Sequence, residues 1–184
     1  MKLSSLLIAV FAMPFISGNV VAADLGMVNL IMTGTIITES CSLDVPSQYQ
    51  HVDLGSFPAN SLTSVGDVTP AKPFTLRLNG CSNSSGNLSS ISDATITFSG
   101  TPDGTDDSLL ALSDFSGSGE MASGVAVQVL DKDMKAVALN TPTSVGTLNE
   151  GNNVLQYYLR YKVTSVPVKA GNASAILYFD MSYQ

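Results

Sequence analysis

Alternation of apolar and polar residues recurs along this chain and is the feature that most limits its fold. It is clearest from Leu155 to Val163, where apolar residues at odd positions alternate with Gln156, Arg160 and Lys162. A period of two places every second side chain on the same face of a β-strand, so this pattern predicts a strand with one buried face. No stretch shows sustained helical periodicity. The chain is therefore predicted to be all-β.

Further strands are predicted at 50–54, 74–78, 94–99, 125–129 and 173–183, with turn-forming residues between them. About seven or eight short strands of this kind are typical of a β-sandwich. The last predicted strand keeps its alternation almost to the end of the sequence. One of its faces carries a row of apolar side chains, which includes Leu177, Phe179, Met181 and Tyr183.

Residues 1–23 have the pattern of a secretory signal peptide. Lys2 is followed by an apolar run, 6–16, and by small residues ending at Ala23. A membrane anchor is the alternative, but the run is too short to span a bilayer comfortably and Pro14 interrupts it. The chain is expected to be exported, cleaved after Ala23 and not inserted in a membrane. Residues 24–184 suffice for one domain.

The charge distribution and the chemistry of the side chains exclude several functions. Fifteen acidic residues outnumber eight basic ones, and no basic cluster exists, so nucleic-acid binding is not expected. His51 is the only histidine, and the sequence has no nucleophile elbow or glycine-rich phosphate loop. Enzymatic activity, a metal site and a cofactor are therefore not expected.

Cys41 and Cys81 are the only cysteines. An even pair in an exported chain predicts a disulfide, whereas two distant thiols and one histidine do not make a metal site.

The segment from Val28 to Ile37 forms another candidate strand. Its apolar residues Val28, Leu30 and Met32 share one face, and Gly34 interrupts the series. A strand so close to the new amino terminus can pair with its own sheet or with another molecule. At the other end, the last predicted strand leaves either an exposed edge or a gap that another strand must cover. The spacing alone leaves intramolecular and intermolecular pairing open.

Several segments together resemble the subunits of type 1 pilin-family fimbriae assembled by the chaperone–usher pathway. The resemblance covers nearly the whole mature chain and rests on the alternation before Gly34 with its spacing to Cys41, the positions of Cys41 and Cys81, the strand 125–131, the segment 166–171 and the final Tyr183-Gln184. It implies an incomplete immunoglobulin-like β-sandwich that lacks its seventh strand. In this family a periplasmic chaperone lends a strand, and at the outer-membrane usher the next subunit's amino-terminal strand replaces it. That replacement is donor-strand exchange.

The resemblance assigns residues 24–35 to a donor-strand extension and 36–184 to the pilin domain. Val28, Leu30, Met32 and Gly34 are the expected donor residues; Leu177, Phe179, Met181 and Tyr183 are expected to face the groove and the chaperone. The expected function is a structural subunit of a surface fimbrium, built head to tail. The short segment before Cys41 and the Val-Pro-Val-x-Ala-Gly sequence at 166–171 favour a minor or tip subunit.

Two alternatives remain. A single-domain carbohydrate-binding fimbrial adhesin is less favoured because residues 24–184 leave no room for the receptor domain of two-domain tip adhesins, and no tryptophan is present to stack on a sugar. A self-complete sandwich would pair residues 24–33 with its own last strand.

Overall fold

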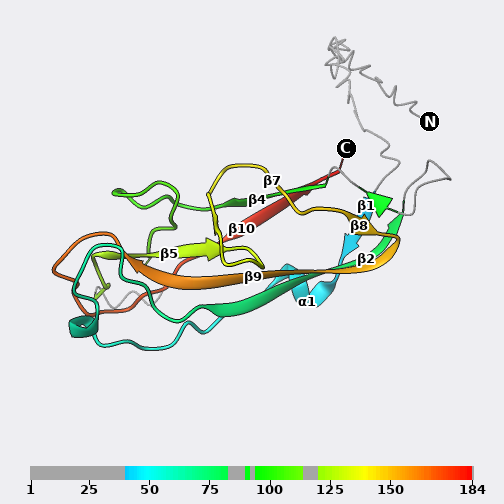
Figure 1. Cartoon of the computed structure of the whole chain (residues 1–184). Helices are drawn as coiled ribbons and strands as arrows, with labels where there is room; N and C mark the ends of the chain where they lie inside the picture. Colours follow the sequence, from blue (N-terminus) through cyan, green and yellow to red (C-terminus); the bar gives the residue numbers. More distant parts are fainter. Residues whose placement is uncertain (1–39, 83–89, 92–93, 114–119, 184) are drawn as a thin grey trace, which may run out of the picture. The chain divides into compact units, whose positions relative to one another are not determined.

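Antiparallel strands dominate the fold, as the alternation predicts. The computed structural model describes residues 40–82, 90–91, 94–113 and 120–183 (Figure 1), all within a unit that comprises residues 36–184. The predicted signal peptide and donor-strand extension lie outside the described residues. The larger sheet has the order β1 (Ser40–Leu43), β2 (Lys72–Ser82), β9 (Gly151–Val163), β5 (Val125–Leu130), β6 (Ala136–Val137).

A second sheet has the order β10 (Tyr178–Ser182), β4 (Thr95–Ser99), β7 (Thr143–Ser144). A short ladder joins β3 (Ser90–Ile91) to β8 (Leu148–Asn149), and the helical elements are α1 (Val45–Gln48) and the 3₁₀ turn η1 (Ala59–Ser61). All the strand pairs are antiparallel. This arrangement is an immunoglobulin-like β-sandwich.

The core lies between the two sheets and is centred on Phe98 of β4, which is fully buried. Its ring lies edge-on to Tyr157 of β9, with centroids 4.9 Å apart, and it also contacts Phe74 of β2 and Phe179 of β10. Aromatic pairs in such edge-to-face arrangements add to the free energy gained by burial. One side chain thus contacts residues of both sheets.

β5 differs from the predicted strand because it is buried on both faces. The alternation predicts a buried face at 125, 127 and 129, but Ala126, Gln128 and Leu130 are buried as well. The loop before Leu110 covers part of this outer face, because its Asp106 pairs with Lys162, which lies opposite Ala126 in the sheet. At the edge of β5, Leu110 and Val127 exchange two backbone hydrogen bonds of 2.9 Å. Ala126 and Leu130 on this face are apolar, and the polar Gln128 accepts a hydrogen bond from Arg160 Nε at 2.9 Å, so the alternation of apolar and exposed polar residues is weak there.

Two further predictions need correction. Residues 50–54 form no strand, because the Gln50 side chain rather than the backbone bonds to β2: its Nε2 donates to the Thr75 carbonyl at 2.8 Å. The strand predicted at 173–183 is shorter, since β10 begins at Tyr178, opposite Ser99 at the end of β4. Residues 173–177 extend past β4 and therefore have no continuous ladder.

Candidate partner-binding groove

The open side of the sandwich lies along β10. This strand pairs with β4 on one edge, and on its other edge the part of the chain that the structure describes supplies no strand. An unpaired edge presents backbone N–H and C=O groups that can bind an added strand. β10 is therefore a template for pairing.

A groove of about 840 Å³ adjoins this edge. One wall is the segment 50–57, with Val52, Leu54 and Phe57, and the other is the segment 173–179, with Leu177 and Phe179. The floor consists of core residues from both sheets, namely Leu76, Phe98, Leu110, Val127 and Leu159. The hydrophobic core thus lies directly beneath an open groove, and an apolar strand placed there would cover it.

Exposure alternates strictly along the carboxy-terminal segment. From Ala173 to Tyr183 every odd-numbered residue is half-buried, whereas every even-numbered residue is exposed, for example Tyr178 at 61%. The odd-numbered face packs against the core without being fully covered.

The structure separates the four carboxy-terminal residues that the sequence analysis grouped. Leu177 and Phe179 line the groove. Tyr183 packs at the other end of β10, against the cluster around Leu78 and the disulfide, and Met181 contacts both this cluster and the main core. The expected donor residues, Val28, Leu30, Met32 and Gly34, lie outside the described residues.

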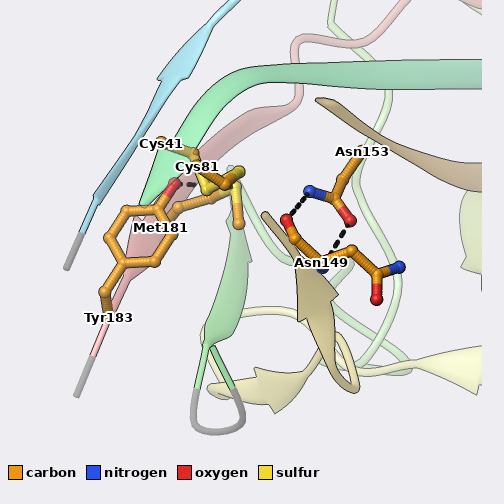
Figure 2. The surroundings of a disulfide bond; sticks show 6 residues. All are labelled: Cys41, Cys81, Asn149, Asn153, Met181 and Tyr183. Atoms are coloured by element: carbon orange, nitrogen blue, oxygen red, sulfur yellow. Dashed lines mark hydrogen bonds between the residues drawn. A yellow bond between two sulfur atoms is a disulfide. The ribbon is translucent and has the colours of Figure 1, made fainter. Parts of the chain in front are cut away.

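The predicted disulfide is present. Cys41 on β1 is bonded to Cys81 on β2, with an S–S distance of 2.07 Å, and it ties the first described strand to the larger sheet. Beside it, the Tyr183 hydroxyl donates to Met181 Sδ at 3.9 Å (Figure 2). Burial raises the pKa of the Tyr183 phenol.

Beyond the end of β1, two side chains form hydrogen bonds with backbone groups on the same edge of β2. The Arg77 amide donates to Ser47 Oγ at 2.9 Å, and Ser47 itself is buried. Together with Gln50, which bonds to Thr75, Ser47 satisfies backbone groups that would otherwise need a neighbouring strand. This edge is closed to strand addition at these positions, in contrast to β10.

Sequence reasoning missed the contribution of Tyr161 and Phe57 to the groove. Tyr161 falls at an odd position of the strand predicted from 155 to 163, and Phe57 lies in a segment with no periodicity. Both line the groove, and their rings meet edge-on with centroids 6.4 Å apart. Burial and, to a lesser extent, the negative charge of Asp53 raise the pKa of Tyr161.

Neither a metal-binding cluster nor a membrane-spanning helix occurs among the described residues. No group of three or more His, Cys, Asp or Glu side chains there could hold a metal ion. Among the described segments, no helix has the length and apolar character needed to cross a membrane.

Comparison with known proteins agrees with this geometry. The family model described as "Fimbrial protein" matches residues 30–184. The S-fimbrial protein subunit SfaG of Escherichia coli O6:K15:H31 is 35% identical over 170 residues, covering 92% of this chain and 89% of SfaG. Long polar fimbria protein A of Salmonella typhimurium is 31% identical over 176 residues, covering 96% and 94%.

Among solved structures, the P pilus rod subunit PapA is similar, with a TM-score of 0.64 and 25% identity over 78% of this chain and 99% of PapA. The chain belongs to the fimbrial protein family. It is a structural subunit of a fimbrium rather than an enzyme, its partners are other pilin subunits, and its place is the surface fimbrium.

Proposed function

We propose that this subunit polymerises head to tail by donor-strand exchange, with residues 24–35 of one copy occupying the groove of the next. The observation that carries the proposal is the edge of β10 that no described strand pairs with, beside a groove whose floor is the hydrophobic core. The proposed strand would pair with β10 through its backbone and cover Leu177, Phe179 and the floor with its apolar face. Heterologous pairing of this kind does not close on itself, so it builds a filament.

The energetics favour such an exchange. Burying the side chains of Val28, Leu30 and Met32 supplies roughly 5–9 kcal/mol of apolar transfer free energy. Backbone hydrogen bonds to β10 add to this, and the ordering of the donor segment offsets part of it. Gly34 has no side chain, which lets the donor backbone lie close to the groove where the groove is shallow.

Strand direction favours a donor from another copy over the chain's own extension. β10 runs toward the disulfide, because Tyr183 packs there, and β1 starts at the same end, with Ser40 opposite Ser82. The chain's own extension must end beside Ser40, so inside the groove it would run parallel to β10. A donor from another copy is free to pair antiparallel, and antiparallel pairs are slightly more stable per residue.

The remaining parts of the proposal concern assembly. Passage through the periplasm, a chaperone that covers the groove before polymerisation and an outer-membrane usher follow from the need to protect the unpaired edge of β10. The short segment before Cys41 and the sequence at 166–171 support a minor or tip position. No observation on the described residues favours the alternative of a carbohydrate-binding adhesin.

The experiment uses the chain from Asp24 to Gln184 with Leu30→Asp, and Asn29→Asp as the matched control on the opposite face. Leu30→Asp should abolish self-assembly, because a buried charge opposes donor insertion, and Asn29→Asp should assemble. Circular dichroism checks folding, and size-exclusion chromatography with electron microscopy measures polymers.

A mixture of wild-type and Leu30→Asp chains gives a stricter test of donor-strand exchange. The Leu30→Asp chain keeps an intact groove, so it should accept a donor and then terminate growth, shortening wild-type polymers in proportion to its fraction. Polymers of unchanged length, or assembly of Leu30→Asp alone, would contradict the proposal.

A further inference from the structure

Exposed apolar side chains surround one end of the groove. At this end the lining of the groove belongs to a separate apolar cluster, with Leu62, Ala122, Val125, Val168 and Ala173. Three exposed apolar residues, each within three positions of a residue of this lining, are Val65, Met121 and Val166. Their exposed fractions are 64%, 43% and 49%. We call these three residues the apolar rim.

The segments that carry the rim are bonded to one another. The Gly66 amide donates to the Val163 carbonyl at 2.9 Å, and the Ser165 amide donates to the Gly124 carbonyl at 3.2 Å. The approach at Gly124 is close, because a Cβ there would lie 2.5 Å from the Ser165 carbonyl oxygen. The rim therefore lies on adjoining segments. Exposed apolar side chains gathered in this way are typical of a protein–protein contact, whereas single ones are ordinary.

The donor strand proposed above would leave the groove at this end. β10 runs from Tyr178 toward the disulfide, so the lining around Val168 and Ala173 lies at the opposite end of the groove. A donor that pairs antiparallel to β10 runs away from the disulfide. Its carboxy-terminal end, residue 35, would then reach the rim.

The connection that follows the donor is short. Only residues 36–39, Ile-Ile-Thr-Glu, separate the donor from β1, which begins at Ser40. An extended chain covers at most about 18 Å between residues 35 and 40, which is less than the diameter of a domain of this size. The domain that supplies the donor must therefore lie against the rim. Ile37 is on the opposite face of the alternation from Leu30 and Met32, so insertion of these residues in the groove does not by itself bury it.

We propose that Ile37 of the copy that supplies the donor packs against the apolar rim of the copy that receives it, forming a second contact outside the groove. This inference rests on the proposed function and deepens it, because it names a surface at which consecutive domains meet. The contact accounts for three exposed apolar residues at the groove end and for an isoleucine on the more polar face of the donor segment. It slows dissociation of the polymer.

The test uses polymers of the chain from Asp24 to Gln184, whose dissociation at a fixed urea concentration is followed by size-exclusion chromatography. Ile37→Thr removes most of the apolar side chain and keeps the β-branch that favours an extended strand. Dissociation should become about fivefold faster, the size expected when roughly half of an isoleucine side chain is no longer buried. Met121→Gln, which keeps the length of the side chain, should have a similar effect.

A double-mutant cycle tests whether the two side chains meet. If Ile37 contacts Met121 of the next copy, the chain with both changes should dissociate about fivefold faster than the wild type, instead of the roughly 25-fold expected of independent changes. Circular dichroism checks that each variant is folded.

The chain offers a matched control for each side of the contact. Ile31→Thr makes the same change on the same face of the donor segment, further from the junction. Met134→Gln makes the same change at a methionine of similar exposure, 46%, in the turn between β5 and β6. Each control should alter the dissociation rate less than about twofold.

The outcomes separate this inference from the proposed function. If the folded wild-type chain does not polymerise, the proposed function fails. If it polymerises and Ile37→Thr dissociates no faster than Ile31→Thr, or the cycle shows independent effects, donor-strand exchange stands and the contact at the rim is overturned. Val65→Thr replaces Met121→Gln if the latter does not fold, because Val65 is the most exposed residue of the rim.

Discussion

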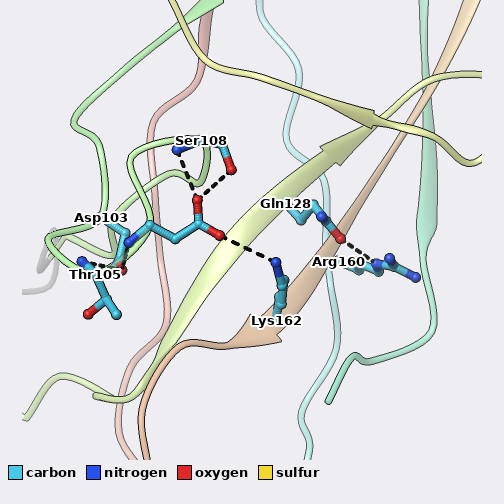
Figure 3. A network of polar contacts seen from close by, with 7 residues as sticks. Asp103, Thr105, Ser108, Gln128, Arg160 and Lys162 are labelled. Carbon is cyan, nitrogen blue, oxygen red and sulfur yellow. Dashed lines mark hydrogen bonds and ion pairs between the residues drawn. The ribbon is translucent and has the colours of Figure 1, made fainter. Parts of the chain in front are cut away.

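Lys162 on β9 forms an ion pair with Asp106, with Nζ 3.3 Å from Oδ2, and so fastens the loop before Leu110 to the larger sheet (Figure 3). The same carboxylate accepts hydrogen bonds from the hydroxyl and the amide of Ser108. These contacts explain how β5, next to β9 in the sheet, comes to be covered on its outer face.

The pH dependence of stability should report on Asp106. Hydrogen bonding from Ser108, and then Lys162, lowers the pKa of this carboxyl in the folded protein, although partial burial opposes the shift. A lowered folded pKa means that the stabilisation is present above the ordinary aspartate pKa, near 4, and is lost as pH falls through the folded value. Asp106→Asn should lower the free energy of unfolding by less than about 1 kcal/mol at neutral pH, because both side chains are partly exposed.

Thermal unfolding between pH 2 and 7 measures this effect. The difference between wild type and Asp106→Asn should shrink as the solution is acidified below about pH 4. The exposed neighbour Asp107, changed to Asn, is the control. A difference that grows on acidification would refute the assignment.

Ser47→Ala should destabilise the domain more than its position in a short helix suggests. The change leaves the Arg77 amide without its acceptor at a site where Ser47 is only 3% exposed. A buried unsatisfied donor costs about 1–3 kcal/mol. Chemical denaturation measures the loss, and Ser42→Ala, at an exposed position of β1, should be nearly neutral. Equal effects of the two changes would show that the Ser47 hydroxyl is dispensable.

Removal of the disulfide should have a larger effect. The bond closes a loop with a sequence separation of 40 residues, for which chain entropy gives about 4 kcal/mol. Cys41→Ala combined with Cys81→Ala should lower the denaturation midpoint by a corresponding amount, and a reductant should reproduce this in the wild type only. A reductant effect that persists in the double variant would have a different origin.

Much of the sandwich could be predicted because alternation is a local property. The strand around 155–163 and the one beginning at Val125 are present. The strand predicted at 50–54 failed, because sequence periodicity cannot reveal that the Gln50 side chain replaces a backbone hydrogen bond. Local patterns indicate which face of a strand is buried, but they do not indicate which strands pair with one another.

The groove itself was harder to predict than its β10 wall. Tyr161 and Phe57 are 104 residues apart in the sequence, counted from their numbers, and no local pattern links them. The Tyr161 hydroxyl donates to the Ala173 carbonyl, and only the folded chain brings these two groups together. Donor residues 28–34 remain a prediction from sequence.

The burial of β5 on both faces limits how this subunit can vary over evolution. Every side chain from Val125 to Leu130 is buried, so any change in size or polarity there disturbs packing instead of altering the surface. Changes in surface chemistry must be absorbed by exposed turns, such as the one at 132–134. The antigenic character of the subunit should therefore reside in its turns, while β5 stays nearly invariant.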